Sequence, residues 1–94
     1  MEALNMNYLE SDLGHLGAGC AVKFALSGNA ANVRLIDSLN FPRFKRGDRY
    51  EYLGGRATKS PVVLRTSHHD HWRAVVDLGG GRGSVNASIS VIGE

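Results

Sequence analysis

The segment that decides the fold runs from residue 62 to residue 91 and reads VVLRTSHHDHWRAVVDLGGGRGSVNASISV. Apolar and polar side chains alternate in three parts of this segment, and a period of two is typical of β-strands with one buried face. Two polar or glycine-rich stretches, residues 67–70 and 79–83, separate the three parts. We therefore predict three strands that are joined by two hairpin turns.

The alternation assigns a direction to each side chain in these three strands. Pro61 precedes the first strand, at a position where a strand does not need its N–H group. Arg73, Val75 and Asp77 are expected to face solvent, because they alternate with the buried set. The residues expected to face inward are Val62, Leu64, Trp72, Ala74, Val76, Leu78, Val85, Ala87, Ile89 and Val91.

The same alternation predicts strands upstream. Residues 20–26 and 32–36 indicate two further strands, and residues 27–29 between them have the composition of a turn. Residues 1–12 are also expected to form a strand, although a single helical turn would fit their composition. The residues of the two central strands expected to face inward are Cys20, Val22, Phe24, Leu26, Val33 and Leu35.

The middle of the chain breaks this pattern. Residues 37–49 lose the alternation and contain both a proline and a glycine, so we predict a loop there. Tyr50 and Tyr52 are two residues apart, as on one face of a short strand. Residues 54–55 are both glycine and are expected to form a turn.

Length and composition limit the fold classes. The chain has 94 residues, of which 12 are glycine and 2 are proline, and 43% of its residues are hydrophobic. This is too short for a TIM barrel, and it is not the composition of a disordered chain. With roughly six to eight short strands, we expect one all-β domain over residues 1–94, a small antiparallel β-sandwich of jelly-roll type.

The compartment is inferred from cysteine usage and hydropathy. Cys20 is the one cysteine, so no internal disulfide can form, and a reducing cytoplasm is expected. The first residues lack the basic start and apolar run of a signal peptide. No stretch has the roughly 20 apolar residues that a membrane helix needs. We therefore expect a cytoplasmic protein with no membrane partner.

The positive charge of the chain is concentrated in its middle third. The net charge is +2, but residues 34–65 hold eight Lys or Arg against three acids. Residues 41–52 interleave four cations with four aromatic residues, so that arginines could contact carboxylate or phosphate and Phe41 or Phe44 could anchor an apolar group. The candidate binding residues are Phe41, Arg43, Phe44, Lys45, Arg46, Arg49 and Arg56.

Four phrases of the sequence carry a resemblance to a known family. They are DLGHL at 12–16, LSGNAANVRL at 26–35, GGRATKSP at 54–61 and HWRAVVDL at 71–78. The chain resembles the bacterial family called domain of unknown function 1883 over roughly residues 6–92. The resemblance implies a compact β-sandwich, and fusions of this domain to signalling modules such as TIR domains suggest an interaction or sensing role. It transfers no catalytic residue.

A histidine cluster provides the candidate metal ligands, His68, His69 and His71. His69 and His71 share a face on an extended backbone and could bind Zn²⁺ or Ni²⁺, with His68 joining through a bend. The cupin metal motif also opens with His-x-His, but the acid and the later histidine that it needs are missing here. Asp70 replaces the glycine expected from the family, so the cluster belongs to this protein. A solvated turn without a metal is the favoured interpretation.

Three functions remain open at this point. We favour a non-enzymatic binding or protein-interaction module whose partner is an unidentified protein or acidic ligand, with no cofactor. The first alternative is binding of nucleic acid or another polyanion through residues 41–52. The second is weak metal binding by His68, His69 and His71. Homo-oligomers are a further expectation, because a small sandwich leaves edge strands open.

Overall fold

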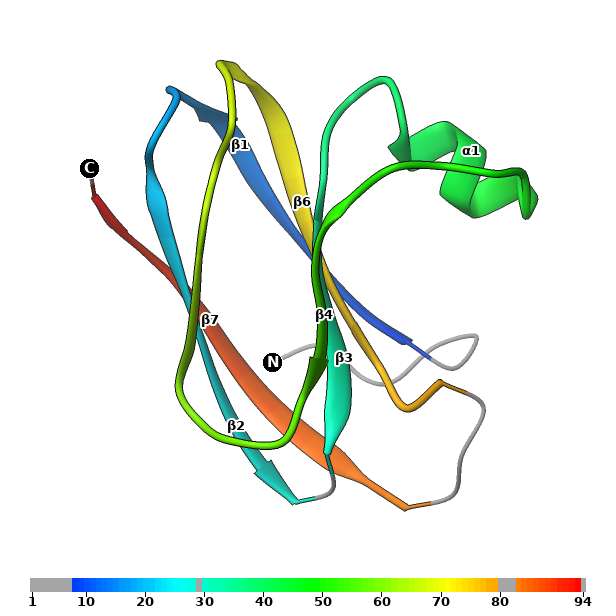
Figure 1. Cartoon of the computed structure of the whole chain (residues 1–94), viewed down its shortest axis with the longest axis vertical. Coiled ribbons are helices and arrows are strands. Elements are labelled where there is room, and N and C mark those ends of the chain that lie inside the picture. Colours follow the sequence, from blue (N-terminus) through cyan, green and yellow to red (C-terminus); the bar gives the residue numbers. More distant parts are fainter. Residues whose placement is uncertain (1–7, 29, 80–82, 94) are drawn as a thin grey trace.

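Two antiparallel β-sheets pack face to face and form the body of the protein (Figure 1). The structure is a computed structural model, and it describes residues 8–28, 30–79 and 83–93. The strand expected over residues 1–12 is confirmed from residue 8 onward, and residues 1–7 lie outside the described part. The elements are β1 (Tyr8–Leu16), β2 (Ala21–Gly28), β3 (Ala31–Ile36), α1 (Phe41–Arg46), β4 (Leu53–Ala57), β5 (Val62–Arg65), β6 (Asp70–Asp77) and β7 (Val85–Gly93).

The strands pair as a nested set. The four-stranded sheet has the order β1-β6-β3-β4, and the three-stranded sheet has the order β5-β2-β7. Thus β3 pairs with β4, β2 with β5 and β1 with β6, as in a long hairpin wrapped into two sheets. This is the arrangement of a jelly roll, so the predicted fold class is confirmed.

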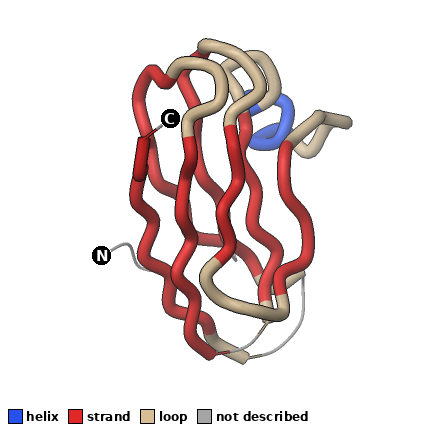
Figure 2. The backbone as a smooth tube through the Cα atoms, turned by 60° about the vertical axis from the view of Figure 1, so that its left-hand side comes forward, coloured by secondary structure: helices blue, strands red, loops and turns tan. Residues whose placement is uncertain are grey.

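The connections after β5 and after β6 correct the prediction of two hairpins. Both connections pass from one sheet to the other, because β6 lies in the four-stranded sheet and β5 and β7 lie in the three-stranded sheet. Loops of this kind gather at the two ends of the sandwich (Figure 2). We call a connection between strands of different sheets an arch. Polar and glycine-rich residues suit an arch as well as a hairpin, so composition alone does not distinguish the two.

The apolar side chains predicted to face inward fill the space between the sheets. Trp72 and Phe24 are the two largest fully buried side chains, at 2% and 0% exposed. Val91 is a correction, because it is 41% exposed at the end of an edge strand. The β7 residues packed against the core are Val85, Ala87 and Ile89, and Val91 lies beyond them, next to the register shift between β7 and β2. The buried core consists of Leu9, Val22, Phe24, Ala31, Val33, Leu35, Ala57, Trp72, Ala74 and Val76.

The four-stranded sheet is buried on both of its faces over part of its length. Val75, expected to face solvent, is fully buried, and so are its neighbours Ala74 and Val76. On the outer face, Val75 packs with Ile36 and Phe41 in a second apolar cluster. Strands buried on both faces carry uninterrupted apolar runs. The run of three apolar residues in β6 is therefore the sequence signal for this second cluster.

Helix α1 covers this outer face, so the prediction of a loop over residues 37–49 is wrong for residues 41–46. Pro42 lies in the first turn of the helix, where its missing N–H group costs no hydrogen bond. Gly47 ends the helix in a left-handed conformation with a φ of 80°. Both residues therefore bound the helix instead of preventing it. Within the described ranges, no helix is long and apolar enough to cross a membrane.

Strand β4 corrects a further prediction, since Gly54 and Gly55 lie within the strand and not in a turn. Gly54 has a φ of 115°, and a Cβ atom there would lie 2.1 Å from the carbonyl oxygen of Val33 on β3. Glycine therefore permits the close approach of these two strands. Tyr50 and Tyr52, expected on a strand, precede β4.

Gly54→Ala should lower the free energy of unfolding by roughly 3 kcal/mol or more, because the added methyl group meets a backbone oxygen and φ is positive. Gly14→Ala is the matched control. Gly14 also has a positive φ, 74°, but a Cβ atom there meets nothing within 4 Å, so the loss should be about 1–2 kcal/mol. Urea denaturation measures both values, and equal losses would contradict the close approach.

Candidate functional site

Helix α1 presents one exposed face to solvent. The helical path begins before Phe41, because the Phe41 N–H group donates to the Asp37 carbonyl at 2.9 Å. From there, exposed side chains recur at intervals of three and four residues, which places them on one side of the helix. Leu39 is 63% exposed, the highest value among the exposed large apolar residues. We call this set the outer face of α1: Leu39, Pro42, Arg43 and Arg46.

The opposite face of α1 holds the helix on the sheet. Phe41 is buried, and the ring of Phe44 meets the rings of Tyr8 and Tyr50 at centroid distances of 5.2 and 5.3 Å. The Arg73 guanidinium lies 4.5 Å from the centre of the Phe41 ring. Phe41 and Phe44, predicted as apolar anchors for a ligand, therefore anchor the helix to its own sheet. Leu39 takes the exposed apolar position, and the alternation did not identify it.

The predicted cations around α1 divide into two groups. Lys45 turns toward β1, where its Nζ donates to the Tyr8 hydroxyl at 3.0 Å. Arg46 pairs with Asp48 at 2.9 Å. Arg43 and Arg49 are exposed, and neither forms an ion pair within the described part of the chain. The basic surface of α1 is thus smaller than the sequence predicts and is formed by arginines.

Arg56 does not join this surface. It lies near the end of β4, opposite Asn32 at the start of β3, whereas α1 follows the other end of β3. Asn32 and Ile36, near the two ends of β3, are about 13 Å apart, since each step from one residue to the next adds about 3.3 Å. Arg56 borders a separate shallow hollow of about 420 Å³ together with Lys59. The structure therefore separates Arg56 from the other predicted binding residues.

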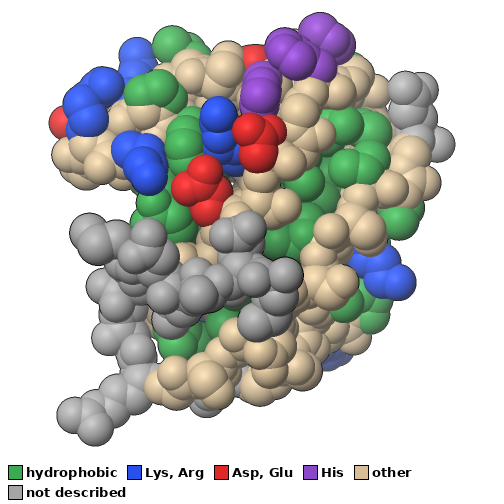
Figure 3. Space-filling view, turned by 180° about the vertical axis from the view of Figure 1, so that it is seen from behind, with side chains coloured by type: hydrophobic (Ala, Val, Ile, Leu, Met, Phe, Trp, Pro, Cys, Tyr) green, Lys and Arg blue, Asp and Glu red, His purple; other side chains and the backbone are tan. Residues whose placement is uncertain are grey.

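A row of alternating charges crosses the outer face of β1 and β6 from α1 to the histidines. Lys45 lies 3.9 Å from Glu10, and Glu10 lies 3.9 Å from Arg73. Arg73 lies 3.6 Å from Asp12, which contacts His71. Figure 3 shows Lys and Arg, acidic and His side chains gathered on this side of the molecule. Because each charge has an opposite neighbour, the row adds no net cationic surface.

The three histidines proposed as metal candidates do not form one cluster, because His68 lies apart from the other two. The Nε2 atom of His71 lies 2.6 Å from Oδ1 of Asp12. A backbone N–H two residues further along and the His71 ring hold the pKa of Asp12 below its ordinary value of 3.8. The rings of His69 and His71 both contact the His15 ring, at centroid distances of 5.8 and 5.0 Å. His68 turns toward two carboxylates, so the three rings do not converge on one point.

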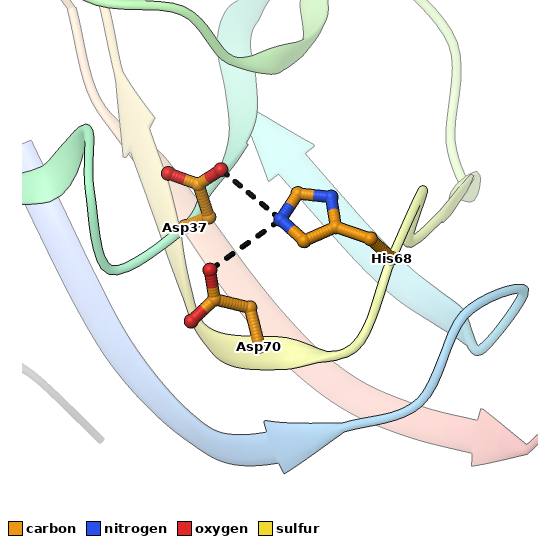
Figure 4. Close-up of side chains that lie close together, drawn as sticks. All are labelled: Asp37, His68 and Asp70. Carbon is orange, nitrogen blue, oxygen red and sulfur yellow. Dashed lines mark ion pairs between the residues drawn. The ribbon is translucent and has the colours of Figure 1, made fainter.

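One histidine and two aspartates do converge, as Figure 4 shows. Nε2 of His68 lies 3.3 Å from Oδ2 of Asp37 and 3.4 Å from Oδ2 of Asp70. Among the described residues, this is the one group of three potential ligands whose atoms all lie within 4.8 Å of one another. Asp37 follows β3, His68 lies in the arch before β6, and Asp70 begins β6. We call these residues the Asp–His–Asp cluster.

A small pocket adjoins the Asp–His–Asp cluster. It has a volume of about 120 Å³ and lies between the segment around α1 and the arch before β6. Two of the three cluster residues, Asp37 and His68, line it, and Glu51, Tyr52 and Trp72 also contribute to its wall. The cluster therefore faces a space that could admit a water molecule or a group of a ligand.

The Asp70 carboxylate is stabilised in its charged form. The Ser38 hydroxyl donates to its Oδ1 at 2.6 Å and, with the His71 N–H group and the His68 ring, holds the pKa of Asp70 below its ordinary value of 3.8. The unfolded chain therefore binds more protons than the folded protein between the two pKa values. The resulting stabilisation is complete above the ordinary pKa and is lost as the pH falls through the folded pKa.

Asp70→Asn should therefore make the unfolding free energy less dependent on pH below about pH 4. Ser38→Ala retains the carboxylate but removes its main hydrogen-bond donor, so it should lose part of the same dependence. Urea denaturation at neutral pH and at about pH 3 measures the change. Unchanged pH dependence in both variants would show that the folded protein does not favour the charged carboxylate.

Comparison with known proteins matches the chain to one family model. The model is described as a domain of unknown function (DUF1883), and it covers residues 6–94, nearly the whole chain. No curated protein and no solved structure matches the chain. The match confirms the family resemblance in the sequence. Since the family description assigns no activity, function is inferred from the geometry of the surface.

Proposed function

The chain belongs to the family described as a domain of unknown function (DUF1883), and we propose that it is a non-enzymatic binding module for an acidic segment of another protein. The outer face of α1 carries this proposal, because exposed Leu39 lies one helical turn from exposed Arg43. Arginine is enriched in the cores of protein interfaces, and the apolar side chain of Leu39 beside it would add apolar area that a partner removes from water. We place the module in the bacterial cytoplasm, since its cysteine is a free buried thiol.

The electrostatics of this surface favour a carboxylate-bearing partner. A guanidinium group matches a carboxylate with two parallel hydrogen bonds. On the outer face of α1, Arg43 has no ion pair in the described part of the chain, and Arg46 has only exposed Asp48. A partner's glutamates could therefore bind Arg43 directly and compete with Asp48 for Arg46.

The packing of α1 supports binding with little reorganisation. Phe41 is fixed in the second apolar cluster, and Gly47 closes the helix through N–H contacts to the Arg43 and Phe44 carbonyls. The backbone that carries Leu39 and Arg43 is therefore held before a partner arrives. A preorganised surface loses less conformational entropy on binding than a mobile loop does.

Nucleic-acid binding is the alternative that the packing disfavours. Base stacking needs exposed aromatic faces, but Phe41 is buried and Phe44 and Tyr50 pack against other rings. Tyr52 is 44% exposed, and the Arg34 guanidinium lies 5.1 Å from the centre of its ring. Within residues 41–52, most of the rings thus stabilise the protein itself.

The combined variant Arg43→Ser/Arg46→Ser should weaken binding of a glutamate-rich peptide that contains one leucine by about tenfold, because two charged hydrogen-bonding groups are lost. Fluorescence anisotropy with a labelled peptide measures the affinity. Leu39→Ser should weaken binding of this peptide, but it should leave binding of leucine-free polyglutamate unchanged.

The matched control is Arg56→Ser/Lys59→Ser, which removes the same charge from a separate exposed surface. This control should retain the affinity of the unmodified protein. Equal weakening by both double variants would show that net charge, and not the outer face of α1, determines binding. Tighter binding of a single-stranded oligonucleotide than of the peptide would favour the nucleic-acid alternative.

A further inference from the structure

We propose that the Asp–His–Asp cluster, formed by Asp37, His68 and Asp70, binds a divalent first-row transition-metal ion of the Zn²⁺ class. The site is distinct from the three histidines that the sequence suggested, because it uses one of them and two carboxylates from other segments. It is also separate from the outer face of α1, so the two proposals can fail independently.

Two of the three distances in the Asp–His–Asp cluster match those between atoms that bind the same metal ion, and the third is within 4.8 Å. Bonds from Zn²⁺ to nitrogen and oxygen are about 2.0–2.2 Å, so neighbouring ligand atoms of a tetrahedral site are about 3.3–3.5 Å apart. The two distances from His68 Nε2 to the carboxylates of Asp37 and Asp70 are 3.3 and 3.4 Å. These atoms therefore lie along two edges of a tetrahedron of the right size.

The contact between His71 and Asp12 provides a direct histidine–carboxylate contact for comparison. Nε2 of His71 and Oδ1 of Asp12 lie 2.6 Å apart, slightly closer than the roughly 2.7–2.9 Å of a typical charged N–H···O hydrogen bond. His68 lies at least 0.7 Å further than that from each of its two carboxylates, at 3.3 and 3.4 Å, and is nearly equidistant from them. At this position Nε2 is held tightly by neither carboxylate, so an ion placed among the three ligand atoms could bind all of them.

Both carboxylates are oriented by hydrogen bonds to their other oxygen atom. Oδ1 of Asp37 accepts from the backbone N–H and the side-chain amide of Asn40, each at 2.9 Å. Oδ1 of Asp70 accepts from the Ser38 hydroxyl and the His71 N–H, each at 2.6 Å. The two Oδ2 atoms remain for a common ligand. Such outer contacts are the usual means by which proteins orient metal-binding carboxylates.

The histidine is oriented in the same way. Nδ1 of His68 lies 2.9 Å from the Ser67 hydroxyl, which leaves Nε2 directed at the carboxylates. The His68 ring packs on Trp72 at a centroid distance of 5.1 Å, and the Trp72 indole donates to the His68 carbonyl at 3.1 Å. Thr66 ties the base of the arch to Cys20 through a backbone hydrogen bond of 3.0 Å. The Nε2 atom of His68 is therefore held in position by contacts within the arch before β6.

The donor set indicates the class of ion. An imidazole nitrogen suits Zn²⁺ and its neighbours in the first transition row, whereas Mg²⁺ prefers oxygen ligands in an octahedral arrangement. Three protein ligands also leave one tetrahedral position open. Asp37 and His68 line the adjoining pocket together with Glu51, so a water molecule or a ligand group could occupy that position.

The test is a titration of the metal-free protein with Zn²⁺, followed by calorimetry and by the thermal unfolding midpoint. We expect saturable binding of one ion and a rise of the midpoint that a chelator reverses. Mg²⁺ at the same concentration should leave the midpoint unchanged. Co²⁺ should give the visible absorption of a tetrahedral site.

His68→Gln is the decisive variant, because it removes the ligand nitrogen from a side chain that is 49% exposed. Its Zn²⁺ affinity should fall by more than about tenfold, while its midpoint in chelator stays close to that of the unmodified protein. His69→Gln is the matched control and should bind Zn²⁺ normally. The absence of saturable binding, or an equal loss of affinity in His69→Gln, would overturn the proposal.

Discussion

The burial of β6 on both of its faces is the constraint on which the rest of the structure depends. Ala74 and Val76 point into the space between the sheets, and Val75 points the opposite way, yet all three are fully buried. If the outer side of this strand were in water, Val75 would be exposed. Exposing a buried valine side chain costs roughly 2 kcal/mol. The chain therefore needs a second apolar layer, and α1 supplies it through Phe41.

The docking of α1 decides what the protein presents to solvent. With Phe41 and Phe44 against the sheet, the helical spacing turns Leu39 and Arg43 outward. The turn that leads into the helix also carries Asp37, which binds Asn40 and faces His68. The proposed peptide surface and the proposed metal site thus have separate ligands but share one structural support.

The sequence predicts the sandwich well, but it predicts poorly the docking of α1 on the outer face of the four-stranded sheet. Alternation identifies Val22, Phe24 and Trp72 as core residues, because one face of each strand is buried. It misses Val75, whose burial depends on a layer formed by a distant segment. Helix α1 is also missed, since six residues with a proline give too short a pattern for helical periodicity.

The candidate sites were predictable only in part. Charge alone makes Arg43 and Arg46 candidates, and the structure places both side chains on the exposed side of α1. The Asp–His–Asp cluster could not be found by local spacing, because β3 and β6 bring Asp37 beside His68 and Asp70 only when the sheet forms. Asp70 gave the available signal, as an acidic residue among histidines. The sequence could not show which histidine would lie beside Asp70, because that depends on the path of the arch before β6.

The measurement that tests this account most directly is an NMR titration of the isotope-labelled protein with the leucine-containing glutamate peptide. If docked α1 forms the binding surface, the largest amide shift changes will occur at Leu39, Arg43 and Arg46 and saturate together. Changes centred on β4 and β5, near Arg56 and Lys59, would contradict the account. So would the absence of any saturable change along α1.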